Sequence, residues 1–477
     1  MGSVPCWIRS VVVMREMQMD RLSSMDEMFL DVEQSGPPVA VGSVMEVAGK
    51  APTLARLKKF VGARLEGMPR FRQVVVPSRS KVRHAKWMDV DPDLDHHIRA
   101  VKLGPGESLD ATVSRVMEIP LDRERPLWDA TLVSGYSTEK WCVIIRLHHS
   151  IADGQGALIL LGRLIDLSPE GGVTLADAIV AMTAPPEQDE PTESDSNGGL
   201  AGISAKLVQA VETGFETAGQ FISTYPDTVR TLANMLPQRS SELTGMVSGR
   251  RIWVGGHYSL TDVKRARKAF SGVTINDMVL ASVAYGFTKL LESRGDDANG
   301  RTLRAVMPVS LRVNAESNNQ VSILPAPLPL GDMDPVKRMR MIKNSTKHSK
   351  RSMLPIISDQ VMRASEKVTP APLQEFVVSR SGVASQYFSE TLVTNVPGPT
   401  IPLYFMGRAT VGNTPIIPIE GSMRIIVGIT SYLDELNIGI TGDGVHATDV
   451  DLLLAGIFEG FDELVNLAAT LEPAAQN

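Results

Sequence analysis

The chain has 477 residues, which is too long for one compact core, so two domains are expected. Its composition, 43% apolar and 21% charged, is typical of a soluble globular protein. A formal net charge of −6 argues against a nucleic-acid-binding protein that relies on a basic surface. No apolar run reaches the ~20 residues that a membrane-spanning helix needs.

The first residues predict no targeting signal. Residues 1–19 hold a short apolar patch interrupted by Arg9, without a basic lead-in or a clear small-residue cleavage site, so we expect a flexible leader. The two cysteines, Cys6 and Cys142, give no disulfide framework, and a reducing cytoplasm is therefore expected. Cys142 lies in an apolar, strand-like run and is expected to be buried.

An acidic linker divides the sequence. Before it, "WCVIIRLHH" (141–149) predicts a buried strand and "GALILLGRLIDL" (156–167) a helix. The linker itself, "PPEQDEPTESDSNGG" (185–199), has no large apolar residue. Residues 203–236 then show helical spacing, which fits either a packed helix or an amphipathic segment that touches lipid. We therefore expect a first domain at 20–184, a connector at 185–245 and a second domain at 246–477.

The second half alternates helices and strands. A helix is predicted over 274–295 and can end at Gly295, a strand is predicted before the Pro-Gly-Pro turn in "ETLVTNVPGP" (390–399), and a hairpin should turn near Asp434. The basic cluster at 337–351 is either a solvated helix face or a patch for phosphates or anionic lipid. With no internal repeat, this order predicts α/β architecture with mixed sheets.

The stretch "RLHHSIADGQGA" (146–157) places two histidines at the end of a predicted strand. Neighbouring side chains of a strand point to opposite faces, so His148 and His149 are poorly placed to bind one metal ion, and no HExxH or CxxC motif adds ligands. One working histidine is favoured instead, since its ordinary pKa suits proton removal from an alcohol or amine. Asp153 is expected to orient the site, and Gly154 to permit a turn.

The HHxxxDG pattern of His148 to Gly154 resembles the signature of the coenzyme A-dependent acyltransferase superfamily. Other blocks look like those of its bacterial wax ester synthase/diacylglycerol acyltransferase family, in the expected order. They are "LSSMDEMFLDVE" (22–33), "RPLWDATLVSG" (125–135), "TINDMVLA" (274–281), "MPVSLR" (307–312), "NNQVSILPAPLPLGDMDPVKRM" (318–339), "TNVPGPTIPLY" (394–404) and "ITSYLDELNIGITGD" (429–443). A second pair, His96 and His97, lacks the Asp-Gly and is interpreted as structural.

The resemblance implies two chloramphenicol-acetyltransferase-like domains with an active-site channel between them. It assigns the general base to His149, with His148 as its support and Asp153 and Gly154 completing the motif. The acceptor oxygen would attack the thioester directly, without an acyl-enzyme, and the sequence has no GxSxG nucleophile elbow.

Four further residues are candidates for the channel or for stabilising the oxyanion. Asn276 and Asp277 either shape the channel or only cap their helix. Asn395 could donate a hydrogen bond to the oxyanion, although fixing the following turn is slightly favoured. Arg312 could pair with Asp153 or bind a CoA phosphate. In the block at 125–135, Trp128 is interpreted as core packing.

The implied function is transfer of a long-chain acyl group from acyl-CoA to diacylglycerol, giving triacylglycerol, with fatty alcohol as another acceptor. Acyl-CoA is a co-substrate, and no bound cofactor or metal is expected. The partners are these lipids and a membrane or lipid-body surface, contacted peripherally from the cytoplasm through 203–236 or 337–351. Two alternatives stay open: an acyltransferase for another lipid or polyketide hydroxyl, and a catalytically silent lipid-binding protein.

Overall fold

The first sheet draws its six strands from both halves of the sequence. The computed structural model describes residues 22, 24–78, 85–151, 160–183, 242–310, 321–351, 389–419 and 421–471. Within these ranges the strand order of the sheet is β11-β12-β1-β6-β5-β4. The strands are β1 (Ala40–Ala48), β4 (Ile98–Lys102), β5 (Trp128–Ser134), β6 (Lys140–His148), β11 (Tyr404–Phe405) and β12 (Arg408–Ile416).

Helices pack on both faces of this sheet. The other elements of this half are α2 (Ser24–Ser35), α3 (Leu54–Gly62), β2 (Gln73–Val76), β3 (Lys86–Asp89), α4 (Leu94–His97), α5 (Leu109–Met117) and α7 (Leu175–Thr183), with two short 3-10 turns at Leu65–Gly67 and Pro69–Arg72. On one face, Leu57 of α3 shares an apolar cluster with Val143 of β6. On the other face, Val113 of α5 packs with Ile144. Burial on both faces explains why β6 is apolar along nearly its whole length.

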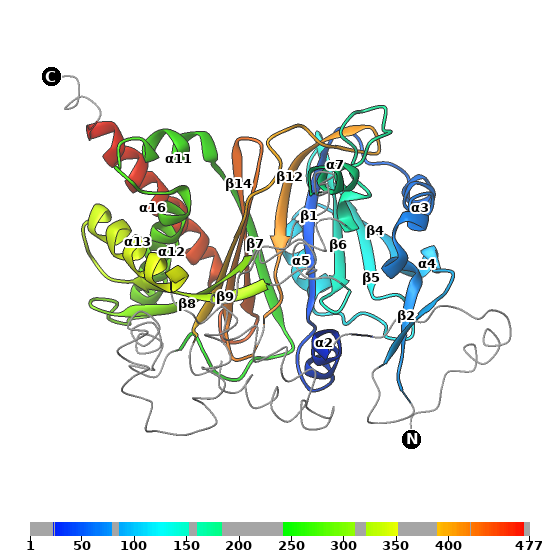
Figure 1. The fold of residues 1–477 in the computed structure, drawn as a ribbon, viewed down its shortest axis with the longest axis horizontal. Helices are drawn as coiled ribbons and strands as arrows, with labels where there is room; N and C mark the ends of the chain where they lie inside the picture. Colours follow the sequence, from blue (N-terminus) through cyan, green and yellow to red (C-terminus); the bar gives the residue numbers. More distant parts are fainter. Residues whose placement is uncertain are drawn as a thin grey trace, which may run out of the picture.

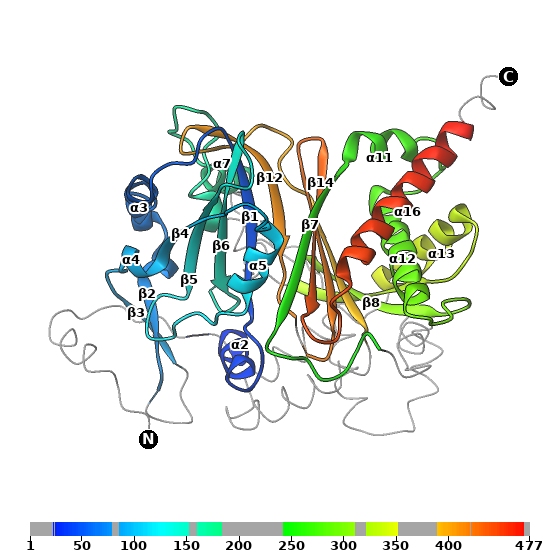
Figure 2. The same cartoon turned by 180° about the vertical axis from the view of Figure 1, so that it is seen from behind.

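Within the described residues, the helices of the second half cover one face of the second sheet. Its strand order is β7-β14-β13-β10-β8-β9. The strands are β7 (Arg251–Ser259), β8 (Thr302–Ser310), β9 (Val321–Pro329), β10 (Thr391–Val396), β13 (Ile425–Tyr432) and β14 (Glu435–Asp443), and the helices are α11 (Leu260–Arg267), α12 (Ile275–Ser293), α13 (Pro335–Arg351) and α16 (Val450–Leu471). Figures 1 and 2 show these helices on the outer side of the sheet, whose inner side faces the first sheet.

A strand exchange links the two halves. β11 and β12 come between β10 and β13 in the sequence, yet they lie in the first sheet, where β12 pairs antiparallel with β1. Part of the segment expected at 246–477 therefore completes the sheet of the first domain. Residues 1–21 and 184–241, which contain the expected leader and most of the connector, lie outside the described residues, and the domain boundaries stay a prediction.

Four of the elements predicted from local pattern are confirmed, but the helix predicted at 156–167 is wrong at its end: residues 160–162 are helical, residues 163–164 turn, and Asp166 forms β-bridges to Thr174 and Tyr404. The strand at 141–149 is β6, and the helix at 274–295 is α12, with Gly295 in the left-handed conformation (φ +84°) just after it. The Pro-Gly-Pro turn follows β10, and the hairpin is β13–β14, turning at Leu433 and Asp434. The expected mixed α/β class with two sheet-rich domains is also confirmed.

Candidate active site

The histidine pair lies where β6 ends. The His148 amide donates to the Leu127 carbonyl (2.9 Å), and the Ile151 amide donates back to the His148 carbonyl (2.9 Å). The backbone therefore leaves the sheet immediately after His148 and turns. Strand alternation places Leu147 in the cluster that includes α3, so His148 points toward the opposite face.

The His148 ring is completely buried, and its neighbours fix its tautomer. The Ser150 amide donates to Nδ1 (3.1 Å), and the Ser150 hydroxyl is 2.7 Å from the same nitrogen. Because an amide N–H can only donate, Nδ1 is the acceptor, and the proton of the neutral ring is on Nε2. This Nε2 is 3.4 Å from Oε2 of Glu33, without a well-aligned hydrogen bond in the described structure. The contact with Glu33 is therefore chiefly electrostatic.

Glu33 is a buried carboxylate held by three neighbours. Its side chain is 6% exposed, the Arg123 guanidinium lies 3.0 Å from Oε2, and the Val39 amide donates to Oε1 (3.1 Å). Burial would raise the pKa of Glu33, but the His148 ring beside it, together with the hydrogen bonds from Arg123 and the Val39 amide, outweighs burial and lowers the pKa to about 2. Glu33 is therefore ionised near neutrality beside His148.

His149 has a different environment. Its ring is half-buried and stacks on Phe29, with centroids 4.0 Å apart and an interplanar angle of 22°. Nδ1 of His149 has no hydrogen-bond partner within the described ranges. The more exposed ring is thus the one expected to face the channel, although its role as a base stays a prediction.

Helix α2 contacts both histidines. Phe29 and Glu33 are four residues apart, so they lie on one face of the helix and meet His149 and His148 respectively. Sequence reasoning used this block only as a family signature and missed both residues. The i, i+4 spacing of an aromatic and an acidic side chain was the available signal.

The remaining motif residues are only partly described. Asp153, Gly154 and Arg312 lie outside the described residues. Asp277 is 4% exposed, and its carboxylate accepts hydrogen bonds from the Thr274 amide (2.9 Å) and hydroxyl (2.8 Å) in a capping box. The helix cap therefore uses the Asp277 carboxylate, and the channel role considered for Asp277 stays a prediction.

Asn276 and Asn395 lie together. The Asn395 amide donates to Oδ1 of Asn276 (3.1 Å), which joins the start of α12 to the end of β10. Both roles considered for Asn395, at the oxyanion and in its own turn, stay predictions. The turn is held by Ser431, whose hydroxyl accepts from the Gly398 amide (3.0 Å), and by Leu433, whose amide donates to Pro399 (3.1 Å). A Cβ at position 398 would lie 1.9 Å from the Ser431 carbonyl oxygen, so only glycine fits.

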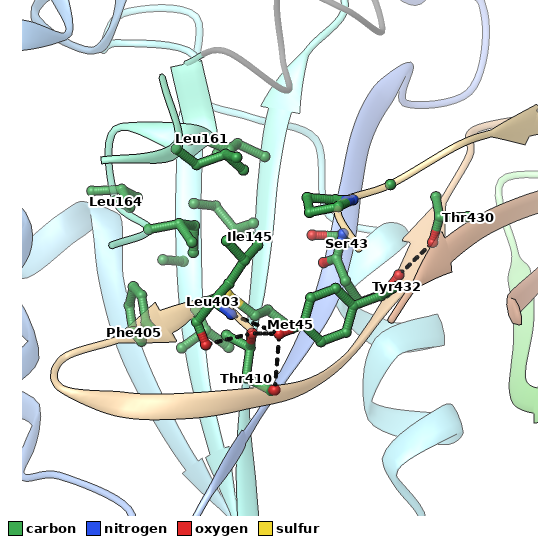
Figure 3. Close-up of a pocket in the computed structure, with 18 of the residues that line it drawn as sticks. Ser43, Met45, Ile145, Leu161, Leu164, Leu403, Phe405, Thr410, Thr430 and Tyr432 are labelled. Carbon is green, nitrogen blue, oxygen red and sulfur yellow. Dashed lines mark hydrogen bonds between the residues drawn. The ribbon is translucent and has the colours of Figure 1, made fainter. Parts of the chain in front are cut away.

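An apolar pocket opens beside the same turn. Its cavity volume is about 120 Å³, and the pocket is partly open to solvent. Figure 3 shows Ile145, Leu161 and Leu164 on one side and Thr410 and Tyr432 on the other. Residues 396–399 also line the pocket, together with residues of β1, β5, α3 and α7. The pocket is therefore lined by the first sheet, the turn after β10 and the exchanged strands. Its apolar lining suits a lipid chain.

Three side chains outside the motif have structural roles, as predicted. His97 is 1% exposed, and its Nδ1 contacts the Trp128 carbonyl (2.8 Å) while its ring stacks on the Trp128 ring at 4.5 Å. Burial lowers the pKa of His97. Trp128 is 1% exposed, and Cys142 is completely buried, with a thiol pKa that burial raises to about 12. In the described part of the chain, no three His, Cys, Asp or Glu side chains are grouped to hold a metal ion.

Two family models match most of the chain. The model of the wax ester synthase/diacylglycerol acyltransferase catalytic domain matches residues 22–279, and that of the C-terminal domain of the same group matches residues 317–465. A probable diacylglycerol O-acyltransferase, tgs1, of Mycobacterium tuberculosis is 29% identical over 462 residues, which cover 94% of this chain and 96% of the relative. Another putative diacylglycerol O-acyltransferase of M. tuberculosis is 26% identical, covering 93% and 89%.

Solved structures share the fold. The wax ester synthase/diacylglycerol acyltransferase of Marinobacter aquaeolei VT8 superposes with a TM-score of 0.68 at 22% identity, covering 94% of this chain and all of that one (100%). The first condensation domain of the CDA synthetase superposes with a TM-score of 0.55 at 15% identity, covering 94% and 96%. At these identities the likeness concerns the two-domain fold alone.

Proposed function

The chain belongs to the wax ester synthase/diacylglycerol acyltransferase family, and on this premise we propose that it transfers a long-chain acyl group from acyl-CoA to the hydroxyl of diacylglycerol. The product is triacylglycerol, and a fatty alcohol acceptor would give a wax ester. The match of the catalytic-domain model over residues 22–279 carries the proposal. The apolar pocket supports it, since an acyl chain is stabilised by removal from water.

In the proposed reaction His149 takes the proton from the acceptor hydroxyl. The acceptor oxygen attacks the thioester carbonyl and forms a tetrahedral oxyanion. Collapse of this intermediate breaks the carbon–sulfur bond, and the departing CoA thiolate takes the proton back from His149. Glu33 and Ser150 hold His148 and, through it, the turn that presents His149. We keep Asn276 and Asn395 as channel candidates, and Asp153, Gly154 and Arg312 keep the roles that the resemblance implies.

An acceptor panel tests the function. Purified full-length protein is incubated with labelled palmitoyl-CoA and diacylglycerol, hexadecanol or no acceptor. We expect labelled triacylglycerol with diacylglycerol and a smaller yield of wax ester with hexadecanol. If the folded protein forms no labelled product from either diacylglycerol or hexadecanol, the result would favour a different hydroxyl substrate or a silent lipid-binding protein. Turnover of a polyketide hydroxyl in place of diacylglycerol would identify the first of these.

The lipid substrates require contact with a membrane or lipid-inclusion surface, and we propose α13 as one contact. None of the helices in the described ranges is long and apolar enough to cross a bilayer. Lys337, Arg340 and Lys347 lie exposed on α13, and Met341 beside them is 44% exposed. Exposed cations around an apolar side chain suit the anionic surface of a cytoplasmic leaflet. The other candidate, 203–236, lies outside the described residues.

Charge reversal on α13 is expected to weaken this contact. The triple variant Lys337→Glu/Arg340→Glu/Lys347→Glu should float with anionic vesicles several-fold less than the wild type, and the difference should shrink at high salt because the attraction is screened. The matched control reverses three exposed charges at α11, Lys264→Glu/Arg267→Glu/Lys268→Glu. Equal losses in both variants would indicate a general charge effect and remove α13 from the proposal.

A further inference from the structure

A second buried carboxylate lies between the two sheets, away from the histidine pair. Glu46 of β1 is 5% exposed. Lys140 Nζ is 2.7 Å from its Oε1, and the Tyr136 hydroxyl donates to the same oxygen (3.2 Å). These contacts come from the first sheet and the turn beside it. Neither they nor Glu46 take part in the proposed reaction.

The second sheet contributes a histidine to this carboxylate. Nε2 of His257, on β7, is 3.3 Å from Oε2 of Glu46. Nδ1 of His257 is 2.9 Å from Oδ1 of Asn437 on β14, and the Asn413 amide donates to that same oxygen (3.2 Å). Because this oxygen accepts from an amide, it is correctly assigned, and Nδ1 of His257 must carry a proton. A second proton on Nε2, facing Glu46, makes the ring an imidazolium.

The exchanged strand β12 passes close to the contact. A Cβ at Gly412 would lie 3.1 Å from Cε1 of His257 and 3.2 Å from Oε2 of Glu46. A side chain there would crowd both partners, so the glycine lets β1, β12 and β7 approach each other. Figures 1 and 2 show these strands side by side where the sheets meet. The contact thus joins the two sheets, with Glu46 buried and the His257 side chain 33% exposed.

Other ionisable groups face His257 from each neighbouring element. Glu435 of β14 is 3.6 Å from Nδ1. Asp110 at the start of α5 lines the same recess as Glu46, Tyr136, Lys140 and His257, and burial raises the pKa of Asp110 to about 6. Two carboxylates therefore favour the charged ring directly, and Asp110 titrates separately in a more acidic range.

We propose that His257 and Glu46 form a proton-dependent clamp that holds the second sheet against the first when His257 is an imidazolium and loosens when Nε2 loses its proton. Loss of that proton leaves a lone pair facing a carboxylate, which replaces an attraction by a repulsion at the same distance. The clamp is independent of the proposed acyl transfer, because none of its groups belongs to that site.

The pH range in which the clamp is formed follows from the shifted pKa values of His257 and Glu46. The hydrogen bond to Glu46 raises the pKa of His257 above 6.5, despite burial, so its stabilising contribution is complete below pH 6.5 and is lost as pH rises through the raised pKa. Burial opposes ionisation of Glu46, but His257 and Lys140 lower its pKa from 4.5 to about 2, so its contribution is complete above pH 4.5 and lost toward pH 2. The clamp is therefore fully formed between these limits.

Titration of the full-length protein tests the clamp. With histidine labelled by ¹³C at Cε1, the His257 signal should titrate with a midpoint above 6.5 in the wild type, and Glu46→Gln should lower that midpoint. The difference in melting temperature between the wild type and His257→Gln should be about 2 °C near pH 6 and should fall to zero or change sign as His257 deprotonates. A matched control, His96→Gln, removes a histidine whose side chain is 38% exposed and should show no such change with pH.

Two outcomes would overturn the clamp. One is a His257 midpoint at or below 6.5 in the wild type. The other is a melting-temperature difference for His257→Gln that stays constant from pH 6 to pH 9. The variant Asp110→Asn removes the titration of the neighbouring carboxyl, so that the effect of His257 on stability is measured alone. The stabilising contribution of Asp110 is lost as pH rises from 3.8 to about 6, before His257 deprotonates. If Glu46→Gln does not fold, the wild-type midpoint and His257→Gln still decide the question.

Discussion

His149→Ala is expected to lower kcat/KM for acyl transfer by about 10²–10⁴-fold, the usual effect of removing a general base. The loss should fall on kcat, with KM nearly unchanged, because proton transfer stabilises the transition state and not the bound substrates. The fold should persist. Within the described structure the His149 ring makes a stacking contact with Phe29, and its removal leaves no buried charge behind.

His148→Ala is the matched control for this prediction. The His148 ring is completely buried between Ser150 and Glu33, so its loss leaves a cavity beside Glu33 and should lower the melting temperature as well as the rate. The two variants therefore separate chemistry from support: a stable, inactive protein in one case and a destabilised, partly active protein in the other. A His149→Ala enzyme with kcat within about threefold of the wild type would exclude His149 as the base, since a general base contributes far more.

Local sequence pattern predicted the elements whose signal is contained in a short stretch. The sequence of β6 predicts a strand because burial of both faces makes it a continuous apolar run. The sequence of α12 predicts a helix because its apolar spacing, its Thr274 cap and the terminating Gly295 all indicate the same element. The position of β11 and β12 in the first sheet could not be predicted in this way. Their partner β1 lies far away in the sequence, and strand pattern gives burial but not the pairing partner.

The same limit applies to the site. Strand alternation predicts that the side chains of His148 and His149 point to opposite faces, and this prediction needs only their neighbouring positions at the end of a strand. The contacts that orient them come from α2, far earlier in the chain, and Phe29 and Glu33 carry no local sign of which histidine they meet. Asn276 and Asn395 were both candidates, but their hydrogen bond depends on the tertiary packing of α12 against β10.

Replacement of Glu33 should give the second large effect. Glu33→Ala is expected to lower the free energy of unfolding by about 1–3 kcal/mol near neutral pH, because it removes the buried carboxylate that accepts from the Val39 amide and from Arg123, whose side chain is 35% exposed. Arg123 and the Val39 amide lose their acceptor, and His148 loses the charge beside Nε2. Activity should fall too, since the turn that presents His149 begins at His148. Denaturant unfolding and single-substrate kinetics measure the two losses.

The pH dependence of the Glu33 effect distinguishes an electrostatic anchor from simple packing. The pKa of Glu33 is lowered from 4.5 to about 2, so its stabilising contribution is complete above pH 4.5 and is lost as pH falls toward 2. The gap in stability between the wild type and Glu33→Gln, which keeps the shape but not the charge, should therefore be widest near neutral pH and close in acid. Asp31→Asn, an exposed carboxylate on the same helix, should show a much smaller gap. A gap for Glu33→Gln that is the same at pH 7 and pH 3 would mean that the carboxylate acts through shape, and that its charge does not hold His148 in place.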